Sequence, residues 1–215
     1  MTFFPHLSQD LDNYWFEAGS KRLRPVNLEG RFVRLVLLGL GHVAALSAVG
    51  TDPEIWKWNP FVSVQSEEEM RHVVEQALVE WEAGRQLPFV IEDKTAGCLL
   101  GSTRYLNPDR ANLRLEIGFS WLTPSVQGTR INPEAKLLLM EYAFETLGCN
   151  RVEFKTDSLN EKSRRALLKL GAKEEGIFRN HMVTKSGRLR HSAYYSVIRE
   201  EWPDVKKGLE KRLVD

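Results

Sequence analysis

Hydrophobic and polar positions along the chain follow two periods, and their order predicts an α/β protein. Strand-like alternation bounded by turn residues occurs at residues 30–36, 87–92, 99–106, 113–121, 151–157, 176–184 and 190–198. Helical spacing occurs at residues 39–49, from 66 onward, from 132 to 148 and at 160–170. We therefore expect an α+β fold, with a mixed central sheet of about seven strands flanked by about four helices.

The strand expected around residues 113–121 leads directly into a loop and a strong helix. Its apolar residues alternate with polar or small ones, which predicts a single buried face: Leu113, Leu115, Ile117, Phe119 and Trp121. In the helix that follows, Asn132 is a suitable N-cap and Pro133 a suitable first residue, and Gly148 suits the end.

The loop at residues 125–131 contains Gly128, so several backbone N–H groups are expected to point toward one place at the helix N-terminus. Such an arrangement favours an anion, typically a phosphate. An ordinary strand-to-helix turn is the alternative. The loop lacks the Lys-Ser/Thr pair of a P-loop and the three glycines of a dinucleotide fingerprint, which argues against those two classes of nucleotide-binding domain.

Composition narrows the remaining classes. The 215 residues carry 30 basic and 29 acidic side chains, so the sequence gives no charge footprint for nucleic acid. Cys98 and Cys149 lack metal-ligand spacing and are typical of a reducing compartment. With no secretory signal and no apolar run near the roughly 20 residues of a membrane span, we expect a cytoplasmic protein. We expect one domain at 28–203, an N-terminal extension at 1–27 and a charged, solvated helix at 204–215.

Four segments together resemble the GNAT N-acetyltransferase superfamily, in the RimJ/RimL-type branch typified by enzymes that acetylate N-terminal amines of ribosomal proteins. The segments are Glu116–Phe119, Gln127–Lys136, the Asn160-x-x-Ser163 spacing and Leu170–Gly176. The resemblance extends from about Leu28 to Trp202. It implies a GNAT fold whose sheet splays open at a CoA groove, between the strand before the loop and the strand at 152–156.

The resemblance implies transfer of the acetyl group of acetyl-CoA, the only cofactor expected, to a primary amine by direct transfer in a ternary complex. The pyrophosphate would lie on the loop and the pantetheine arm beside the preceding strand. The implied cofactor-binding residues are Phe119, Trp121, Leu122, Gln127, Gly128, Thr129, Arg130, Ile131, Asn132, Asn160 and Ser163. Arg130 stands where the family usually has a small residue, so its side chain is expected to point outward, toward a phosphate of CoA.

Two residues are candidates for catalysis. Glu116, on the polar face of its strand, could take a proton from the acceptor ammonium; a solvent-facing or salt-bridged glutamate is the alternative. Ser163 could donate to the leaving thiolate, or could bond its own helix backbone. Many GNAT enzymes use a tyrosine one turn later, where this chain has Leu167 and Leu168. Asn160 is either a CoA contact or a helix N-cap.

The acceptor site is expected between the first two helices and the last two strands. Trp56, Trp58 and Phe61 could line it or pack in the core, and Arg179, His181, His191 and Tyr194 would form the opposite wall. The two histidines lack a third ligand, so no metal is expected. We expect no nucleic-acid or membrane partner, and an amine acceptor that is either a protein N-terminus or a small molecule. The N-terminal extension could contribute to a homodimer contact. A CoA-binding regulatory or scaffolding protein is the alternative function.

Overall fold

The computed structural model describes residues 15–18 and 20–214, and it contains one eight-stranded sheet with the order β1-β2-β3-β4-β5-β6-β8-β7. The strands are β1 (Leu28–Glu29), β2 (Val33–Leu37), β3 (Gln86–Asp93), β4 (Leu99–Asp109), β5 (Arg114–Leu122), β6 (Arg151–Asp157), β7 (Lys173–Val183) and β8 (Leu189–Ile198). The α-helices are α2 (Val43–Gly50), α3 (Pro53–Trp56), α4 (Glu67–Glu82), α5 (Ile131–Glu141), α6 (Glu161–Leu170) and α7 (Trp202–Val214). The α/β prediction is confirmed; the sequence pattern missed the two-residue strand β1 and short helix α3.

The sheet is antiparallel except where β5 pairs with β6, and that parallel pairing is short. It joins Arg114, Leu115 and Glu116 to the first three residues of β6 and ends there. Beyond Glu116 the two strands are no longer paired, although β5 continues to Leu122 and β6 to Asp157. The predicted splay is therefore present, and Glu116 lies where it begins.

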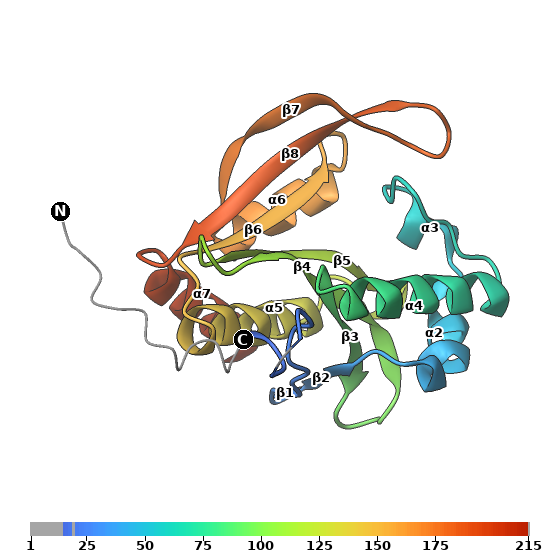
Figure 1. Cartoon of the computed structure of the whole chain (residues 1–215), viewed down its shortest axis with the longest axis horizontal. Helices are drawn as coiled ribbons and strands as arrows, with labels where there is room; N and C mark the ends of the chain where they lie inside the picture. The colour runs from blue at the N-terminus through green and yellow to red at the C-terminus, as the bar shows by residue number, and fades with distance from the viewer. Residues whose placement is uncertain (1–14, 19, 215) are drawn as a thin grey trace.

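Helices cover the two faces of the sheet unequally (Figure 1). The face of the sheet against which α2, α3 and α4 pack is called the front face here. The hydrophobic cluster under these helices includes Trp56, Val90 and Trp121. The rear face carries α5, α6 and α7 over the larger cluster. Strands β7 and β8 form a long curved hairpin that reaches past the sheet toward the segment after α3 (Figure 1). The front of the β6–β8 half is left open by the described helices.

A β-bulge in β5 corrects the predicted alternation of this strand. Leu115 and Ile117 belong to the rear cluster, whereas Phe119 and Trp121 pack in the front one. The pairing register shifts between Ser102 and Arg104 of β4, and Phe119 takes a left-handed conformation with φ 49°. One extra residue reverses the side-chain direction, so the strand buries residues on both faces.

The start of α5 also differs from the prediction. The helix begins at Ile131 with Arg130 at the N-cap position, and Asn132 and Pro133 are its second and third residues. Proline is tolerated there because the first-turn N–H groups have no partner inside the helix. Gly148, with φ 70°, follows the helical segment as predicted, after a π-helical turn at Tyr142–Thr146.

Both ends of the described chain contribute to the rear core. Trp15 is fully buried and donates from Nε1 to the carbonyl of Leu147 at 2.8 Å, and Leu23 is buried in the same cluster. Residues 1–14 and 19 of the expected extension lie outside the described residues. Helix α7 corrects the expectation of a solvated tail, because Val205 and Leu209 are buried.

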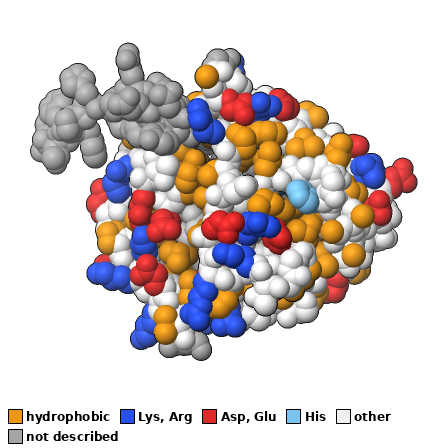
Figure 2. Space-filling model, turned by 90° about the horizontal axis from the view of Figure 1, so that it is seen from below, with side chains coloured by type: hydrophobic (Ala, Val, Ile, Leu, Met, Phe, Trp, Pro, Cys, Tyr) orange, Lys and Arg blue, Asp and Glu red, His pale blue; other side chains and the backbone are white. Residues whose placement is uncertain are grey.

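Two surface properties bear on function. None of the described helices is long and apolar enough to cross a membrane. On the face seen in Figure 2, basic side chains are interspersed with acidic ones, as the balanced composition leads one to expect.

Candidate active site

The loop between β5 and α5 presents three unpaired backbone donors. Its own turns use the N–H groups of Gln127, Thr129 and Ile131. Those of Gly128, Arg130 and Asn132 have no hydrogen-bond partner among the described residues. Gly128 has φ 80°, a conformation that glycine adopts without strain. The loop therefore offers a concave set of donors at the N-terminus of α5, where the helix dipole also favours an anion.

Side-chain bonds tie this loop to the end of β5 and to α6. Gln127 donates from Nε2 to the carbonyl of Leu122 at 2.9 Å, and its Oε1 accepts from Lys162 of α6. Thr129 Oγ1 donates to the carbonyl of Val126 at 2.7 Å. The donors are thus fixed before any ligand arrives, which lowers the entropy cost of binding.

Glu134 anchors the first turn of α5 to the turn between β1 and β2. Its buried carboxylate accepts the N–H groups of Arg31, Phe32 and Val33, each at 2.7 Å. The approach is close, because a Cβ added to Gly30 would lie 2.6 Å from the carboxyl carbon. Sequence reasoning placed Glu134 in the family motif without assigning this role.

Arg130 lies on the rim of the loop. Its side chain is exposed, and the guanidinium stacks over the ring of Phe32 at 4.0 Å from the centroid. The outward direction expected for this side chain agrees with its exposure, and its main-chain N–H is one of the three unpaired donors.

The β5 wall of the groove is shaped by the bulge. Phe119 carries the guanidinium of Arg104 over its ring at 3.8 Å, and burial lowers the pKa of Arg104 to about 10. Trp121 and Trp56 are in ring contact at 5.4 Å between centroids. Trp56 is buried and donates from Nε1 to the carbonyl of Gly50 at 2.7 Å. Of the two alternatives for this residue, an acceptor-site wall or core packing, the structure shows core packing.

Glu116 lies at the start of the splay as a buried carboxylate with one free oxygen. Oε2 accepts from Asn107 Nδ2 at 3.2 Å and from Lys155 Nζ at 3.3 Å. Oε1 has no hydrogen-bond partner among the described residues. The salt-bridged alternative is therefore present, and it leaves an acceptor oxygen for another group.

A row of polar and aromatic side chains continues from Glu116 across the open front face. Lys155 Nζ lies 5.8 Å from the ring centroid of Tyr194, whose hydroxyl is 3.4 Å from His181 Nε2. His181 Nδ1 is 3.0 Å from Ser192 Oγ. Burial and the cations Lys155 and Arg190 lower the pKa of His181, so it is neutral at pH 7. Burial, and then the charge of Glu116, raise the pKa of Tyr194.

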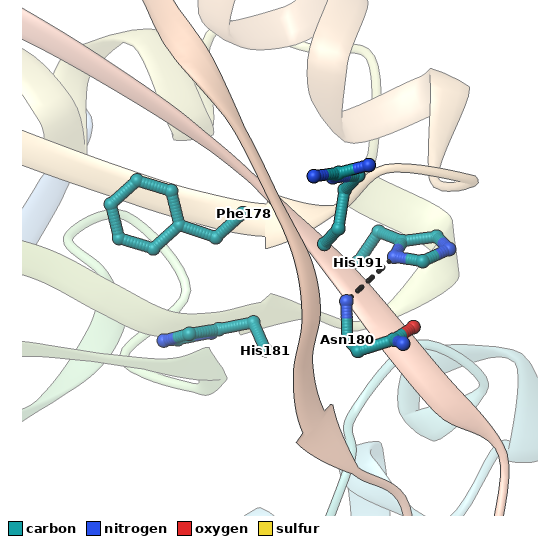
Figure 3. A pocket seen from close by; sticks show the side chains of 5 residues that line it. Phe178, Asn180, His181 and His191 are labelled. Atoms are coloured by element: carbon teal, nitrogen blue, oxygen red, sulfur yellow. Dashed lines mark hydrogen bonds between the residues drawn. The ribbon is translucent and has the colours of Figure 1, made fainter.

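The four residues expected to share the acceptor wall are divided between two faces. Figure 3 shows Phe178 and His181 on one side of β7 and His191 on the other. Asn180 has φ 49° in a second bulge, and its N–H donates to His191 Nδ1 at 2.8 Å. The bulge turns His181 toward Tyr194 and leaves His191 on the opposite side. Arg179 is exposed.

The segment after α3 meets the β7–β8 turn at the far end of this face. The N–H of Lys185 donates to the carbonyl of Pro60 at 2.8 Å. Half-buried Trp58 lines a pocket of about 210 Å³ between the two segments, together with Arg188 of the hairpin. Phe61 is exposed and does not line this pocket.

At the start of α6, Asn160 is the N-cap. Its Oδ1 accepts the N–H of Ser163 at 3.1 Å, which leaves its amide NH₂ free, and Ser163 Oγ has no partner among the described residues. The N-cap alternative is therefore present.

Sequence reasoning assigned no role to Asn107 and Lys155, which contact Glu116, or to Lys136, which contacts Ser120 of β5. The position of Lys155 could have been predicted from the sequence. It lies two residues after Glu153, and pairing of their strand beside the strand with Glu116 brings Lys155 to the same face of the sheet as Glu116. The position of Asn107 could not have been predicted, because it depends on a second register shift in β4.

Metal-dependent chemistry and cysteine nucleophiles are two other routes to catalysis. Among the residues that the structure describes, no group of three or more His, Cys, Asp or Glu could hold a metal ion. Burial raises the pKa of the Cys149 thiol to about 12, so this cysteine is not a thiolate nucleophile at neutral pH.

The geometry agrees with comparison to known proteins. A model of the acetyltransferase (GNAT) domain matches residues 33–173. The chain belongs to the GNAT acetyltransferase family. It is therefore an acetyl-CoA-dependent acyltransferase, and the resemblance seen in the sequence is confirmed.

Two bacterial relatives illustrate the range of similarity. The chain is 30% identical over 155 residues to the N-acetyltransferase p20 of Bacillus licheniformis, covering 71% of this chain and 84% of that protein. It is 36% identical over 110 residues to YdaF of Bacillus subtilis, whose name places it among ribosomal N-acetyltransferases, covering 51% and 59%.

Solved structures share the fold across nearly the whole chain. A GCN5-related N-acetyltransferase from Brucella melitensis superposes with a TM-score of 0.82 at 31% identity, covering 88% of this chain and 86% of that one. Mycobacterium smegmatis RimJ, in complex with CoA-disulfide, superposes with a TM-score of 0.75 at 23% identity, covering 87% and 94%. The second likeness concerns the fold alone.

Proposed function

We propose that the protein transfers the acetyl group of acetyl-CoA directly to a primary amine, with both substrates bound where β5 and β6 diverge. The observation that carries this proposal is the position of Glu116. Its Oε1, unpaired among the described residues, lies at the start of the splay, on the same strand that leads into the donor loop.

The donor half rests on the three unpaired N–H groups of Gly128, Arg130 and Asn132. They suit the pyrophosphate of CoA, and the N-terminus of α5 adds the positive end of the helix dipole. The pantetheine arm would follow β5 along Phe119, Trp121 and Leu122, where β6 no longer occupies the hydrogen-bonding edge. The free amide of Asn160 and the loop contact of Lys162 on α6 support a groove bounded by both segments.

The acceptor ammonium must lose a proton before its nitrogen can attack the thioester carbon. Glu116 Oε1, directly or through a water molecule, takes that proton, and Lys155 on Oε2 holds the carboxyl group in place. The new C–N bond forms as the C–S bond breaks. The second proton lost by the nitrogen goes to the leaving thiolate, passed on by the Ser163 hydroxyl or by water, which each regain the proton they donate. Cys149 is too deeply buried to carry the acetyl group.

A protein N-terminus is the acceptor that the front face fits best. The described helices leave this face uncovered in front of β6 and β8 (Figure 1), so a chain end can reach Glu116 while the rest of its protein stays outside. The pocket beside Trp58, at the far end of the same face, is large enough for one side chain of an extended peptide. The name of YdaF, a ribosomal N-acetyltransferase, supports the same class.

The test compares transfer to short peptides with a free α-amine and to small amines such as polyamines and amino acids. Glu116→Gln should lower kcat for the preferred acceptor by about 10² to 10⁴, the usual contribution of general base catalysis. The control is Glu92→Gln, which changes a carboxylate of β3 that is paired with Arg34 of β2. This variant should leave kcat unchanged. Unchanged turnover in Glu116→Gln would remove Glu116 as the base. Binding of acetyl-CoA without transfer to any amine would favour the regulatory or scaffolding alternative.

A further inference from the structure

A buried lysine without a counter-ion lies beside the proposed donor groove. Lys136, in the second turn of α5, is only 7% exposed. Its Nζ donates to Ser120 Oγ at 2.7 Å, and no carboxylate of the described residues lies within ion-pair distance. A charged amine needs three acceptors and has one, which is a costly state for a buried cation.

Charged groups near Lys136 on α5 and on strands β4 and β5 are engaged elsewhere. On α5 itself, Glu134 is bound to the backbone of residues 31–33, and at its N-cap Arg130 lies over Phe32. On β4, Arg104 stacks on Phe119, and on β5 Glu116 is bound to Lys155. No acidic side chain of the described residues pairs with Lys136, and burial lowers its pKa to about 7.

The contact of Lys136 with Ser120 points to the groove. Ser120 is exposed and lies between Phe119 and Trp121, on the stretch of β5 along which the pantetheine arm is proposed to run. Its Oγ is also 2.7 Å from Thr103 Oγ1 of β4, which fixes the hydroxyl at the wall. A helical lysine side chain leans toward the helix N-terminus, so Nζ lies on the side of the unpaired donors of the loop.

We propose that Lys136 is a further donor-binding residue: its ammonium form, held on Ser120, binds the polyanionic thioester, and donor binding is coupled to the uptake of one proton. This inference rests on the proposed donor site along β5. The ligand class is a thioester whose arm carries amide and hydroxyl groups and whose far end carries a pyrophosphate. The arm supplies the missing acceptors, and the pyrophosphate supplies the missing negative charge.

The coupling has a measurable sign. With a pKa of about 7 in the free protein, roughly a quarter of Lys136 is charged at pH 7.5 and a few per cent at pH 8.5. If the bound form is fully charged, the Kd for acetyl-CoA rises about eightfold between these two pH values. Binding at pH 8.5 then takes up nearly one proton.

The experiment is isothermal titration calorimetry of the full chain with acetyl-CoA at pH 7.5 and 8.5, in two buffers that differ in ionisation enthalpy. The wild type should show the proton uptake and the change in Kd. Lys136→Met should show no proton uptake, and its Kd should be higher than that of the wild type at pH 7.5 and the same at both pH values. Lys169→Met, which removes an exposed lysine of α6, is the matched control and should behave as the wild type.

A second variant guards against misfolding of Lys136→Met. Ser120→Ala keeps the lysine and removes its acceptor, so it should weaken binding while retaining proton uptake. Wild-type binding without proton uptake, or uptake that persists in Lys136→Met, would overturn the role of Lys136 and leave the donor site intact. Absence of acetyl-CoA binding by the wild type at both pH values would instead contradict the proposed function itself.

Discussion

The carboxylate of Glu134 offers the sharpest test of how the donor loop is held in place. Replacing it with alanine removes the acceptor of three backbone N–H groups at once. An unsatisfied buried donor costs about 1–3 kcal/mol. Arg31 and Phe32 are partly accessible and can recover water, whereas Val33 is fully buried. We therefore expect a loss of about 3 kcal/mol in the free energy of unfolding.

The assay is urea denaturation and thermal melting of Glu134→Ala beside Glu134→Gln and Glu141→Ala. For a chain of this size, about 3 kcal/mol corresponds to a fall in Tm of about 6–12 °C. Glu134→Gln keeps one acceptor oxygen and should lose less. Glu141→Ala, on the same helix, removes a half-exposed ion pair with Lys206 and should cost below about 1 kcal/mol.

The outcome also bears on the donor site. Because Glu134 fixes the first turn of α5, Glu134→Gln should raise the Kd for acetyl-CoA even under conditions where the variant is folded. A loss in Glu134→Ala no greater than that in Glu141→Ala would refute the reasoning, since it would mean that the three N–H groups do not depend on this carboxylate.

Three further predictions follow from burial. Trp15→Ala should lower the free energy of unfolding by about 3–5 kcal/mol, measured in urea, because it empties a core position and leaves the carbonyl of Leu147 without its donor. A thiol reagent at pH 8 should modify exposed Cys98 in the folded protein and Cys149 only after unfolding. The lowered pKa of Lys136 means that the unfolded chain binds more protons between about pH 7 and 10, so wild-type stability should gain in that range relative to Lys136→Met, as denaturation at several pH values would show.

Much of the frame could be predicted from the sequence because local signals and tertiary structure agree there. Ser66 caps α4, Asn160 caps α6, and Gly171 ends α6 in a left-handed conformation, each a choice that the backbone itself dictates. The strand at 151–157 matches β6 at both ends. The turn before α5 was predictable for the same reason, since Gly128 stands where φ is positive.

The rest depends on register and on long-range contacts, which periodicity cannot supply. The bulge at Phe119 reverses the direction of the residues after it, so the predicted single buried face of β5 was wrong. The bulge at Asn180 likewise separates His181 from His191. Lys136 looks like a solvated helix residue in the sequence, and only packing against Ser120 shows that it is buried.

The most direct test of the account is a mass spectrum of a reaction containing the protein, acetyl-CoA and a peptide with a free α-amine. We expect a peptide heavier by one acetyl group at its α-amine, an enzyme of unchanged mass, and loss of this product in Glu116→Gln. An acetyl group found on the enzyme as an intermediate, or an unmodified peptide despite bound acetyl-CoA, would contradict direct transfer at Glu116.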